Sequence, residues 1–239
     1  MVNDVSYVRQ NLEAVLADIE HVAAQVGCPP PALIPVTKSA TDEEVLALTA
    51  CGVAAIAENR VPNYRARRDL LASHHLSVPL HLIGSLQTNK VKYIARDVAL
   101  IQSLDSLHLA KEIARRGQEA GRRIPVLIEI NSGREPNKSG LFPEELPAFC
   151  GQLRRTCPDL PVVGLMTMGP VCKQEEEYRP FFAEVRTLLE KMRDAGGFAT
   201  DTPQLSMGMS DSYHAAIREG ATMVRIGHRL FAKNPADRP

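Results

Sequence analysis

The chain has 239 residues, of which 44% are hydrophobic and 23% charged, as is typical of a soluble globular protein that buries a full hydrophobic core. Lys plus Arg and Asp plus Glu both number 28, and a formal net charge of +0 excludes a general electrostatic attraction to nucleic acid or to an anionic membrane. The five cysteines include no C-x-x-C pair, so the composition indicates neither a disulfide framework nor a zinc site and favours a reducing, cytoplasmic compartment.

The N-terminal segment predicts an amphipathic helix over residues 3–26. Its apolar residues recur at helical spacing from Val5 to Val26, and three successive prolines, Pro29 to Pro31, then end the pattern. The segment lacks the basic start and apolar centre of a secretory signal, and no apolar run in the sequence reaches the roughly 20 residues of a membrane-spanning helix. We expect residues 1–28 to pack as a helix on the domain that follows.

After the prolines, short apolar runs alternate with segments of helical character. We expect strands at residues 33–37, 53–57, 79–83, 98–103, 125–130, 161–166, 204–207 and 222–226. We expect helices at residues 42–50, 60–73, 87–95, 106–120, 143–155, 175–194 and 210–219. Thr41 and Glu44 have the spacing of a capping box, Pro143 suits a first helical position, and Gly121 and Gly220 stand where helices should end.

This alternation predicts an α/β protein, a single-domain TIM (β/α)8 barrel over residues 1–239 with the N-terminal helix as an addition. Strand–helix–strand units imply parallel strands, and eight of them in about 200 residues fit the lower end of the size range of this barrel. A doubly wound open sheet is the alternative. It usually has fewer strands, and the G-x-G-x-x-G fingerprint that would follow its first strand is absent.

Polar side chains follow the predicted strands, and in such a barrel the carboxyl ends of all eight strands meet at one mouth. Lys38 follows the first strand and Arg225 lies in the last, and barrel closure places these two strands side by side. Ser210 is a candidate N-cap whose helix would direct backbone N–H groups to the mouth, and Gly227 would let backbone approach a ligand closely. An amine, a guanidinium and an anion-binding loop suit pyridoxal 5′-phosphate (PLP), which has an aldehyde, a ring nitrogen and a phosphate.

Eight stretches of the chain, in the same order, resemble the YggS/PROSC family of PLP homeostasis proteins. They are IPVTKSA (34–40), IAEN (56–59), HLIGSLQTNK (81–90), SLDSLHLA (103–110), EINSGREPNKSG (129–140), GLMTMG (164–169), LSMGMSDSYHAAI (205–217) and VRIG (224–227). The resemblance covers nearly the whole chain and implies a fold-type III PLP protein, similar to the barrel domain of alanine racemase. The chain departs from the family pattern at His228, where Thr is usual, at Ala232 and at Leu80.

The resemblance also implies which residues would hold PLP. Lys38 would form the covalent aldimine, and Arg225 would face the pyridine nitrogen. The phosphate and the ring would be held by a larger set, namely Ser210, Gly227 and the backbone at His228 for the phosphate, and Asn59 and Met209 beside the ring with Ser206 nearby. A charged Arg225 would disfavour protonation of the ring nitrogen, which suits racemisation or simple carrying better than deeper carbanion chemistry.

A two-base racemase needs a second acid or base on the opposite face of the ring. In alanine racemases a tyrosine from an additional C-terminal domain has this role, and we expect no such domain after Gly227. None of Tyr64, Tyr93, Tyr178 and Tyr213 has an evident claim to it. The leading interpretation is therefore PLP storage and delivery without strong turnover. An amino-acid racemase or related PLP enzyme of narrow specificity is the alternative, and an enzyme acting on a phosphate ester through Lys38 without PLP is a third.

The expected partners are PLP and, transiently, PLP-dependent apoenzymes, with no nucleic acid, membrane or metal, for a monomer or weak dimer. Other polar residues near strand ends have simpler interpretations. Lys90 and Lys138 are read as solvated cations, although Lys138 could guide an incoming phosphate, and His81 as a hydrogen-bonded core histidine. Asp105 is equally compatible with a helix cap and with a site residue.

Overall fold

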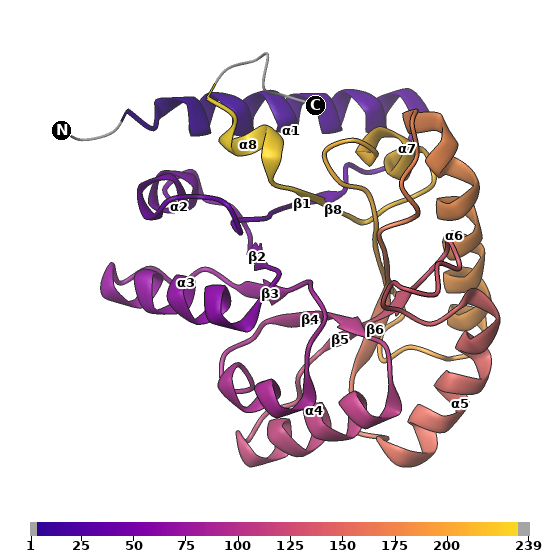
Figure 1. The fold of residues 1–239 in the computed structure, drawn as a ribbon. Coiled ribbons are helices and arrows are strands. Elements are labelled where there is room, and N and C mark those ends of the chain that lie inside the picture. The colour runs from indigo at the N-terminus through magenta and orange to yellow at the C-terminus, as the bar shows by residue number, and fades with distance from the viewer. Residues whose placement is uncertain (1–3, 234–239) are drawn as a thin grey trace.

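The computed structural model describes residues 4–233, in which eight parallel strands form one sheet that curls into a barrel (Figure 1). The strand order around the sheet is β1-β8-β7-β6-β5-β4-β3-β2. The strands are β1 (Ala32–Pro35), β2 (Ile56–Glu58), β3 (Leu80–Leu82), β4 (Leu100–Leu104), β5 (Val126–Ile130), β6 (Val162–Thr167), β7 (Gln204–Ser206) and β8 (Met223–Ile226). The predicted alternation and the TIM-barrel fold are thereby confirmed.

Pairing of the first strand with both of its neighbours closes the barrel. On one side β1 pairs with β8 over its whole length, with Ile34 opposite Arg225. On the other side Val36, just past β1, forms a parallel bridge with Ala57 of β2, and the Thr37 N–H donates to the Ala57 carbonyl at 3.0 Å. The first and last strands therefore lie side by side, as the barrel prediction required.

Helices cover the outside of the barrel. They are α1 (Ser6–Val26), α2 (Asp42–Thr49), α3 (Val61–Ser73), α4 (Leu107–Glu119), α5 (Leu146–Thr156), α6 (Arg179–Asp194), α7 (Tyr213–Arg218) and α8 (His228–Phe231), with 3-10 segments η1 (Thr88–Tyr93), η2 (Pro143–Glu145) and η3 (Glu175–Tyr178). None of the described helices combines the length and apolarity needed to cross a bilayer.

The N-terminal helix packs on the barrel, as expected. In Figure 1 α1 lies across the edge of the molecule beside α7 and α8, and it also contacts α2. The Asn11 side-chain amide donates to the carbonyls of Leu230 and Ala232 at 3.1 and 2.9 Å. These bonds fix α8, which directly follows the last strand, so α1 supports one side of the barrel mouth. Residue 3 of the predicted helix lies outside the described residues.

Alternate side chains of each strand divide the apolar core in two. Outward-facing residues such as Ile56, Leu82 and Ile128 join the large cluster beneath the helices. Inward-facing residues fill the barrel in two smaller clusters, which contain Ile34, Val36 and Ala57 on one side and Leu100, Leu127 and Met166 on the other. The barrel interior is thus a packed core with its polar residues nearer the mouth, and not a pore.

Several predicted boundaries need correction. The strand expected at 53–57 begins only at Ile56, because the chain first makes a turn in which the Gly52 N–H donates to the Thr49 carbonyl. The helix expected at 87–95 is the 3-10 segment η1, with a bond from the Lys90 N–H to the Gln87 carbonyl. The helix expected from 210 starts at Tyr213, and the short α8 after β8 was not predicted. The capping box at the start of α2 is confirmed.

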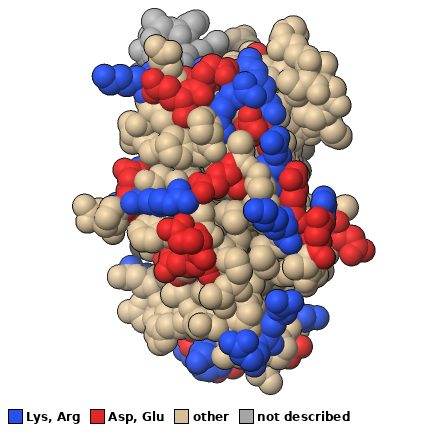
Figure 2. All heavy atoms as spheres, turned by 90° about the vertical axis from the view of Figure 1, so that its right-hand side faces the viewer, with Lys and Arg blue, Asp and Glu red and all other residues tan. Residues whose placement is uncertain are grey.

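Charges of both signs are interspersed on the face that carries α5 and α6 (Figure 2). Many of them are paired, for example Arg134 with Glu184 at 2.7 Å between Nη2 and Oε1, and Arg186 with Glu190 at 3.9 Å between Nε and Oε1. This face therefore presents no broad basic patch of the kind that binds nucleic acid nonspecifically.

Candidate functional site

A chain of buried hydrogen bonds crosses the barrel interior from β8 to β3. Arg225 donates from Nη1 to the Ser206 hydroxyl at 2.7 Å, and Ser206 donates in turn to Gln102 Oε1 at 2.7 Å. Gln102 Nε2 lies 3.1 Å from His81 Nδ1. Since an amide nitrogen only donates, Nδ1 of His81 accepts, and the imidazole carries its proton on Nε2. Each member of the chain thus fixes the orientation of the next.

Arg225 is held as a cation deep in the barrel. Only 3% of its surface is exposed, and besides Ser206 it donates from Nη2 to the Thr167 carbonyl at 2.8 Å. Burial lowers its pKa to about 10, and attraction by Glu129 opposes this shift. The guanidinium is therefore charged at neutral pH, and among the described residues only two of its N–H donors have an acceptor.

Glu129 places a second titratable group in the same interior. The residue is 4% exposed, and burial raises the pKa of its carboxyl to about 7, with repulsion by Asp105 adding to the shift and Arg225 opposing it. Burial also raises the pKa of Asp105. The three groups are close enough for the charges of Asp105 and Arg225 to shift the pKa of Glu129 in opposite directions.

Lys38 stands at the mouth, two residues beyond the inward-facing Val36. The intervening Thr37 donates its hydroxyl to Glu58 at 2.6 Å, and Lys38 then lies in a turn that the Ala40 N–H closes by donating to the Thr37 carbonyl. Lys38 is exposed, and within residues 4–233 no carboxylate forms an ion pair with its ammonium group. The strand β1, which precedes Lys38, pairs with β8, which contains Arg225. Adjacent strands of the barrel therefore carry the amine and the guanidinium.

Asn59, directly after β2, carries an unsatisfied polar atom. Its Oδ1 is buried and has no hydrogen-bond partner among the described residues. The backbone there is tightly packed, because a Cβ on Gly84 would lie 2.1 Å from the Asn59 carbonyl oxygen. A buried amide oxygen without a donor costs about 1–3 kcal/mol, so its position favours a ligand or water that donates to it.

The loops after β7 and β8 form the neighbouring part of the rim. The Arg225 N–H donates to the Gly208 carbonyl at 3.0 Å, which joins the loop that carries Met209 and Ser210 to β8. Met209 is 37% exposed, whereas Ser210 is buried. Gly227 has a φ of −120°, and a Cβ there would come within 2.9 Å of the Val36 carbonyl oxygen. The glycine therefore lets β8 continue past β1 without a clash.

The predicted N-cap role of Ser210 is wrong. Helix α7 begins at Tyr213, and Ser212 precedes it. The Ser212 hydroxyl accepts from the Met209 N–H at 3.1 Å and so closes a turn before the helix, with the Ser212 N–H donating back to Met209. His228 is exposed and opens α8, in which the Leu230 N–H donates to the Gly227 carbonyl at 2.9 Å. The backbone donors expected from a helix that starts at Ser210 are absent, because α7 starts three residues later.

Other candidate residues lie in more ordinary surroundings. His81 is a hydrogen-bonded core histidine, as expected, and burial lowers its pKa to about 4. Lys138 pairs with Glu135 at 2.5 Å between Nζ and Oε2. Asp105 does not cap α4, since Ser106 takes that position and accepts from the Leu109 N–H. Of the two alternatives for Asp105, the helix cap is therefore excluded.

Every tyrosine of the chain lies in a helix outside the barrel. The hydroxyl of Tyr64 donates to Asp97 at 2.7 Å, and that of Tyr213 donates to Asp18. Tyr7 donates to Glu44, whereas Tyr178 accepts from the Cys172 N–H. The fifth, Tyr93, is 44% exposed in η1. No tyrosine hydroxyl in residues 4–233 is placed to act as an acid or base in the barrel interior.

Sequence reasoning missed Gln102 and Glu129 as members of the interior polar layer. Gln102 stands beside Ser103 in the otherwise apolar LIQSL, and Glu129 is the one polar residue of VLIEI. A polar residue in a strand that is buried on both faces is costly unless it is paired or used, and this signal could have identified them.

A family model and two known proteins show what the chain resembles. Residues 10–235 match the family model for the alanine racemase N-terminal domain. The pyridoxal phosphate homeostasis protein of Aquifex aeolicus is 39% identical over 201 residues, which cover 84% of this chain and 86% of that protein. The protein of the same name from Mus musculus is 30% identical over 210 residues, or 85% of this chain and 77% of the relative.

Solved structures agree with this likeness. PipY of Synechococcus elongatus, determined with PLP bound, has a TM-score of 0.76 and 29% identity, covering 88% of this chain and all (100%) of that one. Alanine racemase of Corynebacterium glutamicum has a TM-score of 0.70 at 18% identity and covers 97% of this chain, which spans 61% of the racemase. The second comparison concerns the fold alone.

Proposed function

The chain belongs to the alanine racemase N-terminal domain family, and from this premise we propose that it binds PLP at the barrel mouth and acts in PLP homeostasis, storing and delivering the cofactor. The names of its relatives support the proposal, since proteins 30–39% identical to this chain are PLP homeostasis proteins. The PLP-bound structure of PipY supports it as well.

The residues present fit PLP. When bound, PLP supplies an aldehyde that captures an amine reversibly, with loss of water. Lys38 offers an amine at the rim, and no described carboxylate competes for it. Arg225 offers hydrogen-bond donors from the barrel interior, and its charge would keep the ring nitrogen of PLP unprotonated. Asn59, with its unsatisfied Oδ1, and the exposed Met209 would lie beside the ring.

The phosphate would lie at the rim formed by the loops after β7 and β8. The loops after β7 and β8 supply Ser210, Gly227 and the backbone at His228, the usual location of a phosphate site in this barrel. Ser210 would contribute its own hydroxyl, not the N-terminus of α7. Ser206 would act indirectly, because its hydroxyl proton is given to Gln102 and its oxygen accepts from Arg225. It would hold the guanidinium in place beneath the ring.

The site suits the reversible carrying of PLP better than the racemisation of an amino acid. A two-base racemase needs a second acid or base on the ring face opposite Lys38, and each described tyrosine lies outside the barrel. The interior His81 is neutral and already committed to Gln102. We therefore propose reversible capture and release of PLP, with transient contact to PLP-dependent apoenzymes, as the function of this chain.

The experiment is a PLP titration of the purified protein, followed by absorbance, with Lys38→Ala beside it. We expect saturable binding with a shifted absorbance band in the wild type and loss of that band in the variant. Exchange of the α-proton of a panel of amino acids in D₂O should remain at the rate of free PLP. Exchange well above that rate, abolished by Lys38→Ala, would show that the chain is an enzyme of the racemase kind.

A further inference from the structure

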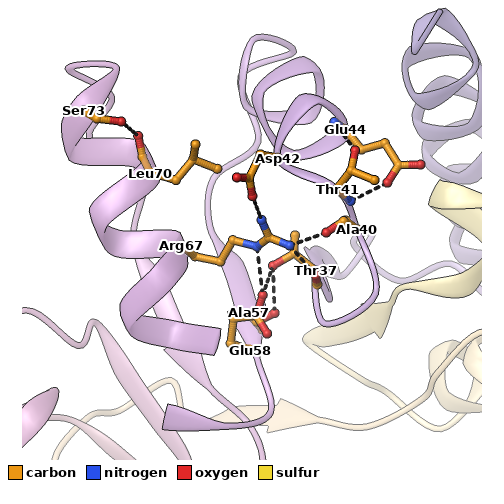
Figure 3. A network of polar contacts seen from close by, with 10 residues as sticks. All are labelled: Thr37, Ala40, Thr41, Asp42, Glu44, Ala57, Glu58, Arg67, Leu70 and Ser73. Carbon is orange, nitrogen blue, oxygen red and sulfur yellow. Dashed lines mark hydrogen bonds and ion pairs between the residues drawn. The ribbon is translucent and has the colours of Figure 1, made fainter. Parts of the chain in front are cut away.

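The loop that carries Lys38 is held from behind by one arginine of α3, in a network that Figure 3 shows. Arg67 donates from Nη2 to the Thr37 carbonyl at 3.3 Å and also to the Ala40 carbonyl. These two carbonyls bracket Lys38, and the Ala40 N–H donates to the Thr37 carbonyl at 3.0 Å to close the turn. One guanidinium group therefore binds both ends of the four-residue turn that presents the lysine.

The other donors of Arg67 anchor the turn to the barrel and to α2. Nε donates to Glu58 Oε1 at 3.3 Å, and Nη1 pairs with Asp42 Oδ1 at 2.5 Å. Glu58 is fully buried, and its Oε1 also accepts from the Thr37 hydroxyl at 2.6 Å. Glu58 directly precedes Asn59, so the same network ties the lysine loop to the residue with the unsatisfied amide oxygen.

The hydrogen bonds of Arg67 are more numerous and more buried than those of an exposed surface ion pair. Only 11% of the Arg67 side chain is exposed, and its planar fork serves four acceptors on three elements. A lysine has a single point of charge and cannot reproduce this arrangement. The peptide group between Thr37 and Lys38 is oriented by its carbonyl bond to Arg67, and that orientation sets the direction in which the Lys38 side chain leaves the backbone.

We infer that Arg67 is a positioning residue that holds the Lys38 loop in the conformation that captures PLP, an inference that rests on the proposed function. Arg67 acts through backbone carbonyls and has no contact with the cofactor site itself. Its loss should allow the turn to sample other conformations and so lower the fraction of time in which the amine is correctly placed. Capture should slow by about tenfold, as misplaced reacting groups do.

The test compares Arg67→Ala with Arg68→Ala, the next residue of α3, whose guanidinium pairs with Asp69 and Asp97 away from the lysine loop. The rate of PLP capture is followed by stopped-flow absorbance well below the melting temperature of each variant. We expect capture about tenfold slower than wild type in Arg67→Ala and within twofold of wild type in Arg68→Ala. Millimolar methylguanidinium should restore the capture rate of Arg67→Ala, whereas methylammonium should not.

Amide exchange of the ligand-free protein gives an independent readout. The Ala40 amide should exchange about tenfold faster in Arg67→Ala and unchanged in Arg68→Ala. Unaltered capture in Arg67→Ala, or slow capture that methylguanidinium does not restore, would overturn the inference. If the wild type captures no PLP, the proposed function fails, and amide exchange at Ala40 alone tests the inference. Faster exchange in Arg67→Ala would then support the role of Arg67 in holding the loop, and unchanged exchange would refute it.

Discussion

Replacing Ser206 by alanine tests whether the buried chain of hydrogen bonds is needed to hold the guanidinium beneath the mouth. The change removes one hydroxyl and leaves two buried partners unsatisfied, an N–H of Arg225 and Oε1 of Gln102. Each such group costs about 1–3 kcal/mol, with the higher figure for the charged donor, so we expect a loss of about 3 kcal/mol in the free energy of unfolding. In a chain of this length the melting temperature should fall by about 6–12 °C.

The assay is thermal and urea unfolding of Ser206→Ala beside Ser77→Ala. Ser77 is exposed in the loop before β3 and has no hydrogen bond to the described part of the chain, so its loss should cost less than about 0.5 kcal/mol. The Arg225 side chain should also move from its place in Ser206→Ala, which we expect to weaken PLP retention at saturating protein. Equal stability of the two variants would refute the assignment of Ser206 as the support of Arg225.

The titratable His214 and Glu129 and the tightly packed Gly84 can each be tested by substitution. Hydrogen bonds to Glu175 and Asp18 raise the pKa of His214, so its stabilising effect is complete below about pH 6.5 and is lost as pH rises through the raised pKa. The stability deficit of His214→Gln in urea should therefore shrink between about pH 6 and 9, and a deficit that stays constant over this range would contradict the role of these bonds. Burial raises the pKa of Glu129 to about 7, so folding favours its neutral form, and the free energy of unfolding falls as pH rises from about 4.5 to 7. Glu129→Gln should therefore be more stable than wild type at about pH 8. Equal or lower stability of the variant at that pH would contradict the burial argument. Gly84→Ala should lower the melting temperature severely, because its Cβ would lie 2.1 Å from a carbonyl oxygen. Gly151→Ala within α5 should instead raise stability by about 0.5–1 kcal/mol. Similar effects of the two changes in calorimetry would exclude this packing account.

The barrel and the pairing of its first and last strands were predictable because hydrophobic alternation is a local signal. LIPVT and TMVRI each have the apolar character of a buried strand, and the rule that closes an eight-stranded barrel then places Lys38 beside Arg225. The residue types at the strand ends already suited PLP, and the resemblance to a known family supplied the expected role of each residue.

The supports of the site were not predictable from the sequence. Arg67 reads as one of several basic residues in VPNYRARRDLL, and nothing in its spacing shows that it reaches two carbonyls beside Lys38. Such bonds depend on how α3 packs against the loop after β1, which is a tertiary property. Ser210 was assigned as an N-cap because serine is common there, but Ser212 offered an equally suitable side chain and lies closer to the helix start.

The central claim is that Lys38 is the residue that captures PLP, and borohydride reduction of the loaded protein followed by peptide mapping tests it most directly. Reduction converts the C=N bond into a stable amine, so the modified lysine survives digestion and can be located by mass. The account predicts one modified peptide, which contains Lys38 from the loop after β1. Modification of Lys90 or Lys138 in place of Lys38 would contradict it.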